Sequence, residues 1–258
     1  MKATILLSFF LLFTLLSSAE TKRPVAPWPP KFPVRMIIDT DADNEIDDQY
    51  AVALALGFPN KIKIEGFVVA HFGDFGGPSG IEKSKQELER VLDRAGMAGK
   101  FPIKRGAHPI RYKEQVESSE GIDFIIEQAR KSTPEDPLWL VLLGPATDGA
   151  VALLKDPSIA DRLIIFWHGR TEWPARAWNY NTINDIKAAQ LLFELPCRFV
   201  LFDTGTYLRM SAEETKRRYE PLGPLGAYLQ EIRGRKPYFM TAHKGFFDLG
   251  DLAAFADP

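Results

Sequence analysis

The chain contains 258 residues, of which 45% are hydrophobic and 26% are charged, and its formal net charge is −2. This composition is typical of a folded globular protein and excludes the collagen-like, coiled-coil and disordered classes. The near-neutral charge provides no basic stripe for phosphate contacts, so we expect no nucleic-acid partner. The single cysteine, Cys197, excludes an internal disulfide and a zinc site built from several cysteines, and we expect it to be a small buried hydrophobe.

The first nineteen residues have the pattern of a secretory signal peptide. Lys2 precedes an apolar run over residues 4–16, and small residues stand at the −3 and −1 positions of a signal-peptidase cut after Ala19. The run is too short to cross a bilayer comfortably. We therefore predict that residues 1–19 are removed and that the protein is exported, to a periplasm or to the medium, with no membrane association afterwards.

The proline-rich segment 20–33 is predicted to be an extended lead-in to one domain over residues 34–258. Strands are expected over 34–39, 62–70, 102–105, 138–143, 163–167 and 198–202, and helices over 46–56, 79–95, 122–130, 148–154, 184–194 and 212–219, with a last helix from about residue 249. Ser79 and Glu82 have the spacing of a capping box, and Asn184 is the expected cap of its helix.

Near-strict alternation of strands and helices predicts an α/β fold. We expect an open, mostly parallel sheet with helices on both faces, a Rossmann-like architecture, because the strands are continuous apolar runs rather than alternating ones. In such sheets ligands bind beyond the carboxyl ends of the strands. Residues that directly follow strands are therefore the first candidates for function.

The most informative segment follows the first strand. Six carboxylates lie within ten residues there, namely Asp39, Asp41, Asp43, Glu45, Asp47 and Asp48. Charges this close repel one another, so the loop is either well solvated, partly neutralised by a helix N-terminus, or wrapped around a cation. Hard oxygen donors in this number favour Ca²⁺ among the cations.

The residues of this acidic loop also allow other interpretations to be compared. A solvated acidic turn, with its last two aspartates as first-turn helix charges, stays open. An EF-hand is excluded because its sixth position, which requires glycine, is Asn44 and its twelfth is Tyr50 rather than glutamate. The Asp-x-Asp pattern of residues 39–41 also fits loosely a phosphotransferase nucleophile, although no later lysine and acidic pair supports it.

The same segment resembles the aspartate signature of the inosine/uridine-preferring nucleoside hydrolases, Asp-x-Asp-Pro-Gly-x-Asp-Asp. Here it runs from Asp39 to Asp48 with two extra residues, as Asp-Thr-Asp-Ala-Asp-Asn-Glu-Ile-Asp-Asp. Residues 143–148, Leu-Gly-Pro-Ala-Thr-Asp, are similar to the family's Leu-Gly-Pro-Leu-Thr-Asn. Weaker matches follow in the family's order at 105–110, 178–189 and 247–258. The resemblance implies a divergent, exported subgroup with the nucleoside hydrolase fold.

The resemblance also implies a Ca²⁺ ion at the bottom of a pocket. Asp41, Asp48 and Asp248 would be its carboxylate ligands, Thr147 would donate its backbone carbonyl, and Asp39 would support the ligands from behind. Asp41 would also be the general base that takes a proton from a metal-bound water as it attacks an oxocarbenium-like sugar. The implied activity is hydrolysis of the N-glycosidic bond of a ribonucleoside or related N-riboside, releasing base and ribose.

Further residues are implied as substrate contacts. Asp47 would bond a ribose hydroxyl, and Asn181 and Asn179 would hold the sugar from the other side. The remaining candidates are His71, His243 and Trp178. The leaving base poses a separate question, because Phe247 stands where family members that handle inosine or pyrimidines usually have histidine. His243 is the candidate to stand in for it.

His108 and His168 are interpreted as structural residues, at a turn and at a strand end. Two alternative functions are hydrolysis of another pentose glycoside and Ca²⁺-dependent binding of a sugar or nucleoside without catalysis. Family members often associate, so a homo-oligomer is also implied.

Overall fold

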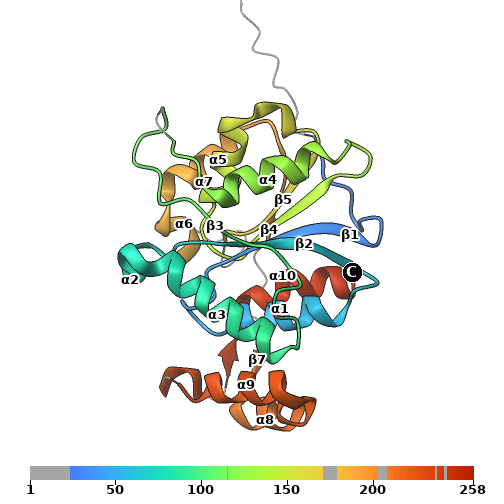
Figure 1. The fold of residues 1–258 in the computed structure, drawn as a ribbon, viewed down its shortest axis with the longest axis vertical. Helices are drawn as coiled ribbons and strands as arrows, with labels where there is room; N and C mark the ends of the chain where they lie inside the picture. The colour runs from blue at the N-terminus through green and yellow to red at the C-terminus, as the bar shows by residue number, and fades with distance from the viewer. Residues whose placement is uncertain (1–23, 115, 171–178, 203–207, 236, 241–242) are drawn as a thin grey trace, which may run out of the picture.

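The computed structural model describes residues 24–114, 116–170, 179–202, 208–235, 237–240 and 243–258. The predicted signal peptide and Trp178 lie outside the described residues, so both stay predictions. In the part described, a parallel sheet stands between two layers of helices (Figure 1), and the predicted α/β architecture is confirmed. Among the described helices, none combines the length and apolar character needed to cross a bilayer.

The central sheet has six strands, all parallel. They are β1 Val34–Thr40, β2 Ile62–Val69, β3 Ile103–Arg105, β4 Leu138–Leu142, β5 Leu163–His168 and β6 Arg198–Phe202. Their order is β3-β2-β1-β4-β5-β6. The chain therefore builds one half of the sheet outward from β1, crosses over, and builds the other half outward from β4. The strand order reverses between β1 and β4, where ligands of doubly wound sheets bind.

Helices cover both faces of this sheet (Figure 1). One layer contains α1 Asp47–Gly57, α3 Gly80–Arg94 and α10 Phe247–Ala256, with α8 Ala212–Tyr219 and α9 Gly223–Arg233 beyond it. The other contains α4 Glu120–Arg130, α5 Thr147–Lys155 and α7 Ile186–Glu194. The short helix α2 Gly73–Gly76 follows β2, and the short helix α6 Tyr180–Asn184 precedes α7. Strand β7 Arg209–Met210 pairs antiparallel with β8 Lys244–Gly245.

Two hydrophobic cores result, one on each side of the sheet. Ile38 belongs to the core beneath α1, α3 and α10, whereas its neighbour Ile37 belongs to the core beneath α4, α5 and α7. Successive side chains of a strand point to opposite faces, so strands that are apolar throughout supply both cores. Cys197 is fully buried in the second core, as predicted.

Two helix starts differ from the sequence predictions. Ser79 makes no capping hydrogen bond, because its φ of −99° and ψ of 5° are not the extended conformation that a cap requires, and Glu82 instead bonds Arg105 at 2.9 Å. The cap of α7 is Asp185, not Asn184, and it accepts a backbone hydrogen bond of 3.0 Å from the first turn.

The lead-in packs against the domain rather than lying free. Residues 24–33 form no helix or strand, but the ring of Trp28 lies 5.5 Å from Phe255, 5.9 Å from Phe166 and 6.2 Å from Trp139, measured between ring centroids. These contacts connect the segment to α10 and to strands β4 and β5.

Candidate functional site

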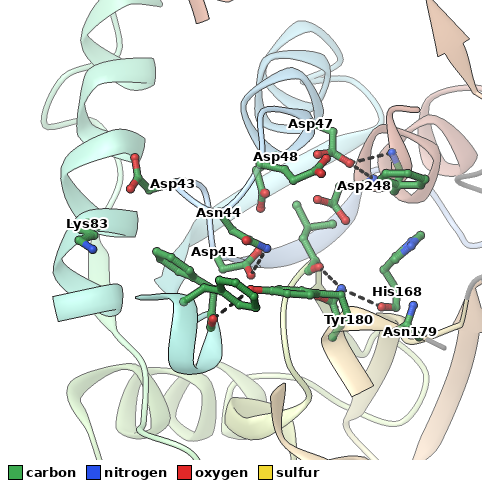
Figure 2. Close-up of a pocket in the computed structure, with 16 residues that line it drawn as sticks. Asp41, Asp43, Asn44, Asp47, Asp48, Lys83, His168, Asn179, Tyr180 and Asp248 are labelled. Atoms are coloured by element: carbon green, nitrogen blue, oxygen red, sulfur yellow. Dashed lines mark hydrogen bonds between the residues drawn. The ribbon is translucent and has the colours of Figure 1, made fainter. Parts of the chain in front are cut away.

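A cavity of about 780 Å³ opens at the carboxyl ends of β1, β4 and β5. This is the place where the strand order reverses. Its lining comes from the acidic loop and the start of α1, from the segment after β2, from the ends of β4 and β5, from α6 and from the start of α10 (Figure 2). The cavity therefore gathers residues from both halves of the sheet.

Four buried aspartates share one wall of the cavity. Asp41 follows β1, Asp47 and Asp48 begin α1, and Asp248 lies in the first turn of α10; each is at most 6% exposed. Asp47, Asp48 and Asp248 each offer a carboxylate oxygen within 4.8 Å of the others. Figure 2 shows Asp41, Asp48 and Asp248 around one space. The structure thus brings a residue from the end of the chain to the acidic loop.

Asp47 joins the N-termini of two helices. Its Oδ2 accepts hydrogen bonds from the backbone N–H groups of Phe247, at 2.7 Å, and Asp248, at 3.2 Å. Neither α1 nor α10 has a side-chain cap of its own, since the preceding residues are Ile46 and Phe246. Helix N-termini present free N–H groups and partial positive charge, so the start of α10 stabilises the acidic side chain at the start of α1.

One lysine balances part of the acidic charge. Lys244 is 5% exposed, and its Nζ lies 2.5 Å from Glu45 and 3.9 Å from Asp47. Lys244 carries one positive charge, so it cannot balance the remaining buried carboxylates of this wall. Burial, and next the charge of Asp48, raises the pKa of Asp41 well above its usual range.

The pKa values of Asp48 and Asp248 are raised as well. Burial, and then the charge of Asp47, raises the pKa of Asp48 to about 7. The same causes raise the pKa of Asp248 well above its usual range. Carboxylates that are buried side by side are costly to ionise, and a divalent cation among them removes that cost. The wall therefore has the properties of a cation site with oxygen ligands.

A carboxyl pair lies behind this wall. Asp39 and Asp148 are both fully buried, and Oδ1 of Asp148 accepts a hydrogen bond of 2.7 Å from the backbone N–H of Ala107. Burial, and then the charge of Asp148, raises the pKa of Asp39, and burial raises the pKa of Asp148 to about 7. Two carboxyl groups in such contact do not both ionise, so they share a proton. Asp39 thus lies under the cavity wall rather than in the cavity.

His168, which the sequence suggested to be structural, lines the cavity at the end of β5. Its Nδ1 lies 3.0 Å from Oδ2 of Asp251 in α10. Burial lowers the pKa of His168, but the charge and close contact of Asp251, together with the charges of Asp47 and Asp48, outweigh burial, so the pKa of His168 is raised overall. Burial raises the pKa of Asp251. The available signal was position: His168 directly follows an apolar strand, as Asp41 does.

Two asparagines complete the polar wall. Asn181 Nδ2 donates to the carbonyl of Leu143, at 2.6 Å, and to that of His168, at 2.9 Å, so it bridges the ends of β4 and β5. Asn179 Oδ1 accepts a hydrogen bond from the N–H of Thr182 at 3.0 Å and caps α6. Both asparagines line the cavity, and so does Leu143.

Aromatic side chains form another wall. The rings of Phe75 and Tyr180 lie 5.9 Å apart between centroids, and the Tyr180 hydroxyl donates to the carbonyl of Phe72 at 3.2 Å. Phe72 is buried, whereas Phe75 is 81% exposed at the rim. A flat, conjugated ligand can stack against such a wall.

Three predicted site residues lie away from the described cavity. Thr147 Oγ1 donates to Asp185 Oδ2 at 2.8 Å, and it lies 2.8 Å from His71 Nε2. Because the N–H of Gly73 donates to His71 Nδ1 at 3.1 Å, the ring carries its proton on Nε2 and donates it to Thr147. Burial lowers the pKa of His71 to about 4, so the ring is neutral. His243 is exposed.

The sequence model of one protein family, described as inosine-uridine preferring nucleoside hydrolase, matches residues 36–257. The chain belongs to this nucleoside hydrolase family. The resemblance inferred from the aspartate signature is thereby confirmed, and hydrolysis of an N-glycosidic bond is the reaction class of the enzyme. No protein sequence in a curated set matches the chain.

Solved structures of nucleoside hydrolases share the fold. A plant nucleoside hydrolase superimposes with a TM-score of 0.71 and 20% identity, over 88% of this chain and 79% of that chain. A purine-preferring ribonucleoside hydrolase from Gardnerella vaginalis gives a TM-score of 0.69 and 21% identity, over 87% and 80%. An inosine-guanosine nucleoside hydrolase gives 0.68 and 17%, over 87% and 79%. At these identities the likeness shows the fold of the nucleoside hydrolases.

Proposed function

We propose that this nucleoside hydrolase uses Ca²⁺ to hydrolyse the N-glycosidic bond of a ribonucleoside or related N-riboside, and that it releases base and ribose. The observation that carries the proposal is the meeting of Asp41, Asp48 and Asp248 in one buried wall, where the strand order of the sheet reverses. Family membership supplies the reaction class, and the cavity supplies a cation site, a proton acceptor and an aromatic wall.

The proposed Ca²⁺ ligands are the carboxylates of Asp41, Asp48 and Asp248 and the carbonyl of Leu143. Leu143 takes the place of Thr147 in the proposed set because Leu143 lines the cavity and Thr147 does not. Carboxylate and carbonyl oxygens are the donors that Ca²⁺ favours, and a cation would offset the cost of ionising aspartates that are buried side by side. When bound, Ca²⁺ would hold the sugar diol and make a water molecule more acidic.

Asp41 is the proposed general base. Its Oδ2 accepts a hydrogen bond of 3.2 Å from Asn44, whose backbone N–H also closes a turn onto the Asp41 carbonyl at 2.8 Å. As the water oxygen bonds to the anomeric carbon, a water proton passes to Asp41 and the bond from that carbon to the base nitrogen breaks. The electron pair of that bond leaves with the base. The negative wall favours the positively charged, oxocarbenium-like transition state over the neutral substrate.

The remaining residues are proposed to hold the substrate. Oδ1 of Asp47 makes no hydrogen bond within the described part of the chain, so it is available to accept one from a ribose hydroxyl. Asn181 fixes the Leu143 carbonyl and bounds the sugar space. The base would stack against Phe75 and Tyr180, whose rings form the rim.

Release of free ribose tests the proposal directly. Inosine, uridine and adenosine are each incubated with the protein and Ca²⁺, with EDTA as the removal control and Ca²⁺ readdition as the rescue. We expect ribose from at least one nucleoside, loss of activity in EDTA and recovery on readdition. Nucleoside binding in calorimetry without ribose release would indicate a binding protein, and release from other pentose glycosides alone would indicate the other alternative.

A further inference from the structure

We propose that the cavity holds a second divalent cation, bound by His168, Asp251 and Asp248. One ring nitrogen of His168 and one carboxylate oxygen of each aspartate lie within 4.8 Å of one another. Asp248 belongs to this group and also to the proposed Ca²⁺ site, so its carboxylate would bridge the two ions. The inference goes beyond the proposed hydrolysis, and it rests on the proposed Ca²⁺ site, with which it shares Asp248.

The main observation is a short contact between His168 and Asp251 that gives neither side chain a hydrogen bond. Nδ1 of His168 and Oδ2 of Asp251 are 3.0 Å apart. Yet neither this nitrogen nor either carboxylate oxygen of Asp251 makes a hydrogen bond to any residue that the structure describes. Asp251 is 0% exposed and His168 is 6% exposed. Buried polar atoms almost always have a partner, and one ion between the two side chains would provide it for both.

An imidazolium–carboxylate ion pair is the competing explanation. Such a pair would direct the ring N–H at the carboxylate and form a charge-assisted hydrogen bond. The contact here is short enough for that bond but lacks its alignment. Ligands of one metal ion instead lie side by side, with their lone pairs directed at a common point. A short contact that leaves both atoms without a hydrogen bond fits two neighbouring ligands of one ion.

The charge of the wall also favours a second cation. Its buried carboxylates are those of Asp41, Asp47, Asp48, Asp248 and Asp251. Lys244 reaches Asp47 at 3.9 Å. With one Ca²⁺ ion and this lysine, two of the five negative charges stay unbalanced. A protonated His168 would balance one of them, whereas a second divalent cation balances both.

The donor set indicates the class of ion. One imidazole nitrogen and two carboxylates suit a divalent transition metal such as Zn²⁺, whereas Ca²⁺ prefers a shell of oxygens. The backbone of His168 is fixed because its carbonyl accepts the hydrogen bond from Asn181 at 2.9 Å. Figure 2 shows His168 and Asp248 on the same side of the cavity. Three protein ligands would leave coordination positions open for water or substrate.

Metal counting tests the proposal. The full-length protein is saturated with Ca²⁺ and titrated with Zn²⁺ by calorimetry, and bound metals are counted by elemental analysis after gel filtration. We expect one Zn²⁺ and one Ca²⁺ per chain. Asp251→Asn and His168→Asn should weaken Zn²⁺ binding at least ~10-fold while Ca²⁺ binding persists. His108→Asn is the matched control, because His108 is an exposed histidine that reports adventitious Zn²⁺.

The proposal is overturned if the wild type takes up no Zn²⁺ in excess Ca²⁺, or if only His108→Asn reduces the uptake. Should the cavity variants fail to fold, histidine NMR of the wild type decides instead: Zn²⁺ must shift the His168 ring signals and leave those of His108 in place. The count is independent of turnover. Ribose release with one bound metal would contradict this inference and leave the proposed function intact. Two bound metals without ribose release would support this inference and contradict the proposed function.

Discussion

Asp41 is held in the cavity by its own loop. The side chain of Asn44 donates to its carboxylate, and the backbone of Asn44 closes the turn beneath it. The acceptor is therefore in place before a substrate arrives, which is the condition under which a general base contributes most. A cation bound beside it would lower this raised pKa.

Replacing the acceptor tests this role. Asp41→Asn keeps the size and the turn but removes the basic oxygen, so we expect kcat on the best nucleoside to fall ~10²–10⁴-fold at saturating Ca²⁺. Asp43→Asn is the control, because Asp43 is a less buried carboxylate of the same loop and should keep most of the activity. Wild-type turnover in Asp41→Asn would mean that another group takes the proton.

The Asp39–Asp148 pair predicts a pH effect on stability. The folded pKa of Asp148, about 7, lies above its unfolded value, so the shared proton stabilises the metal-free fold at low pH and this contribution is lost as the pH rises through about 7. Asp148→Asn removes the second charge. We expect the variant to gain stability relative to the wild type as the pH rises from about 4 to about 7, by up to ~1.4 kcal/mol per pH unit, and the difference to level off above that range.

Urea denaturation in EDTA at several pH values measures this difference. The Asp123→Asn variant changes an exposed carboxylate in α4 and should show no such pH dependence relative to the wild type. A wild-type-minus-variant difference that is constant across the pH range would contradict the shared proton.

Spacing alone predicted single residues only where neighbours in the chain are neighbours in space. Asp41, Asp47 and Asp48 follow one strand, so their approach to one cavity could be read from their spacing. Asp248, Asn179 and Asn181 were expected only from the family resemblance. Thr147 and His71 could not be placed, because Thr147 bonds Asp185 at the start of a different helix and His71 bonds Thr147. His168 was interpreted as structural because its position at a strand end does not by itself reveal its partner, Asp251, which comes from the last helix.

At the scale of elements, the junction of α1 and α10 shapes the site. Asp47 accepts two backbone hydrogen bonds from the first turn of α10 and so fixes the position of Asp248. Both helices lack side-chain caps of their own. One side chain therefore serves both the local stability of α10 and the geometry of the cation site.

Removing the carboxylate of Asp47 should destabilise the junction of α1 and α10. For Asp47→Ala we expect the free energy of unfolding to fall by ~1–3 kcal/mol, because two buried N–H groups lose their acceptor. Denaturation in EDTA measures the change without a metal contribution. Asp123→Ala, in the exposed first turn of α4, should cost less than ~1 kcal/mol. An equal effect of both changes would contradict a special role for the junction.

Helices were harder to predict than strands. The six strands were expected within one residue of their ends, because each is a continuous apolar run. Helix α9 was not predicted, since Gly223, Pro224 and Gly226 resemble a turn. Gly226 instead permits close packing: a Cβ there would lie 1.8 Å from the carbonyl oxygen of Tyr219. A glycine required by a tertiary contact cannot be distinguished from a turn glycine in one sequence.

At the scale of the molecule, the cavity joins two halves of one sheet. Asp41 comes from the β1 half, Leu143 from the β4 half, and Asp248 from the last helix. A cation bound by all three would connect segments that are distant in the chain. Its binding free energy would then add to the stability of the whole fold rather than of one element.

Thermal unfolding tests this coupling. At a Ca²⁺ concentration of about 100 times Kd, the added stability is ~2.7 kcal/mol, which for a chain of this size raises Tm by roughly 5–10 °C. EDTA should reverse the shift. Asp248→Asn should abolish most of it, whereas Asp43→Asn should retain it. If Ca²⁺ leaves the Tm of the wild type unchanged, Ca²⁺ is not the ion of this site.

The acidic loop has an inner and an outer part. Asp41 and the pair Asp47–Asp48 are buried, whereas residues 43–45 between them are half-exposed at the cavity mouth. The buried members are anchored by β1 and by the amides of α10, and Asn44 ties the intervening stretch to Asp41. The two residues by which this loop exceeds the usual signature fall between the anchored carboxylates, so the extra length shapes the cavity mouth while Asn44 still holds Asp41.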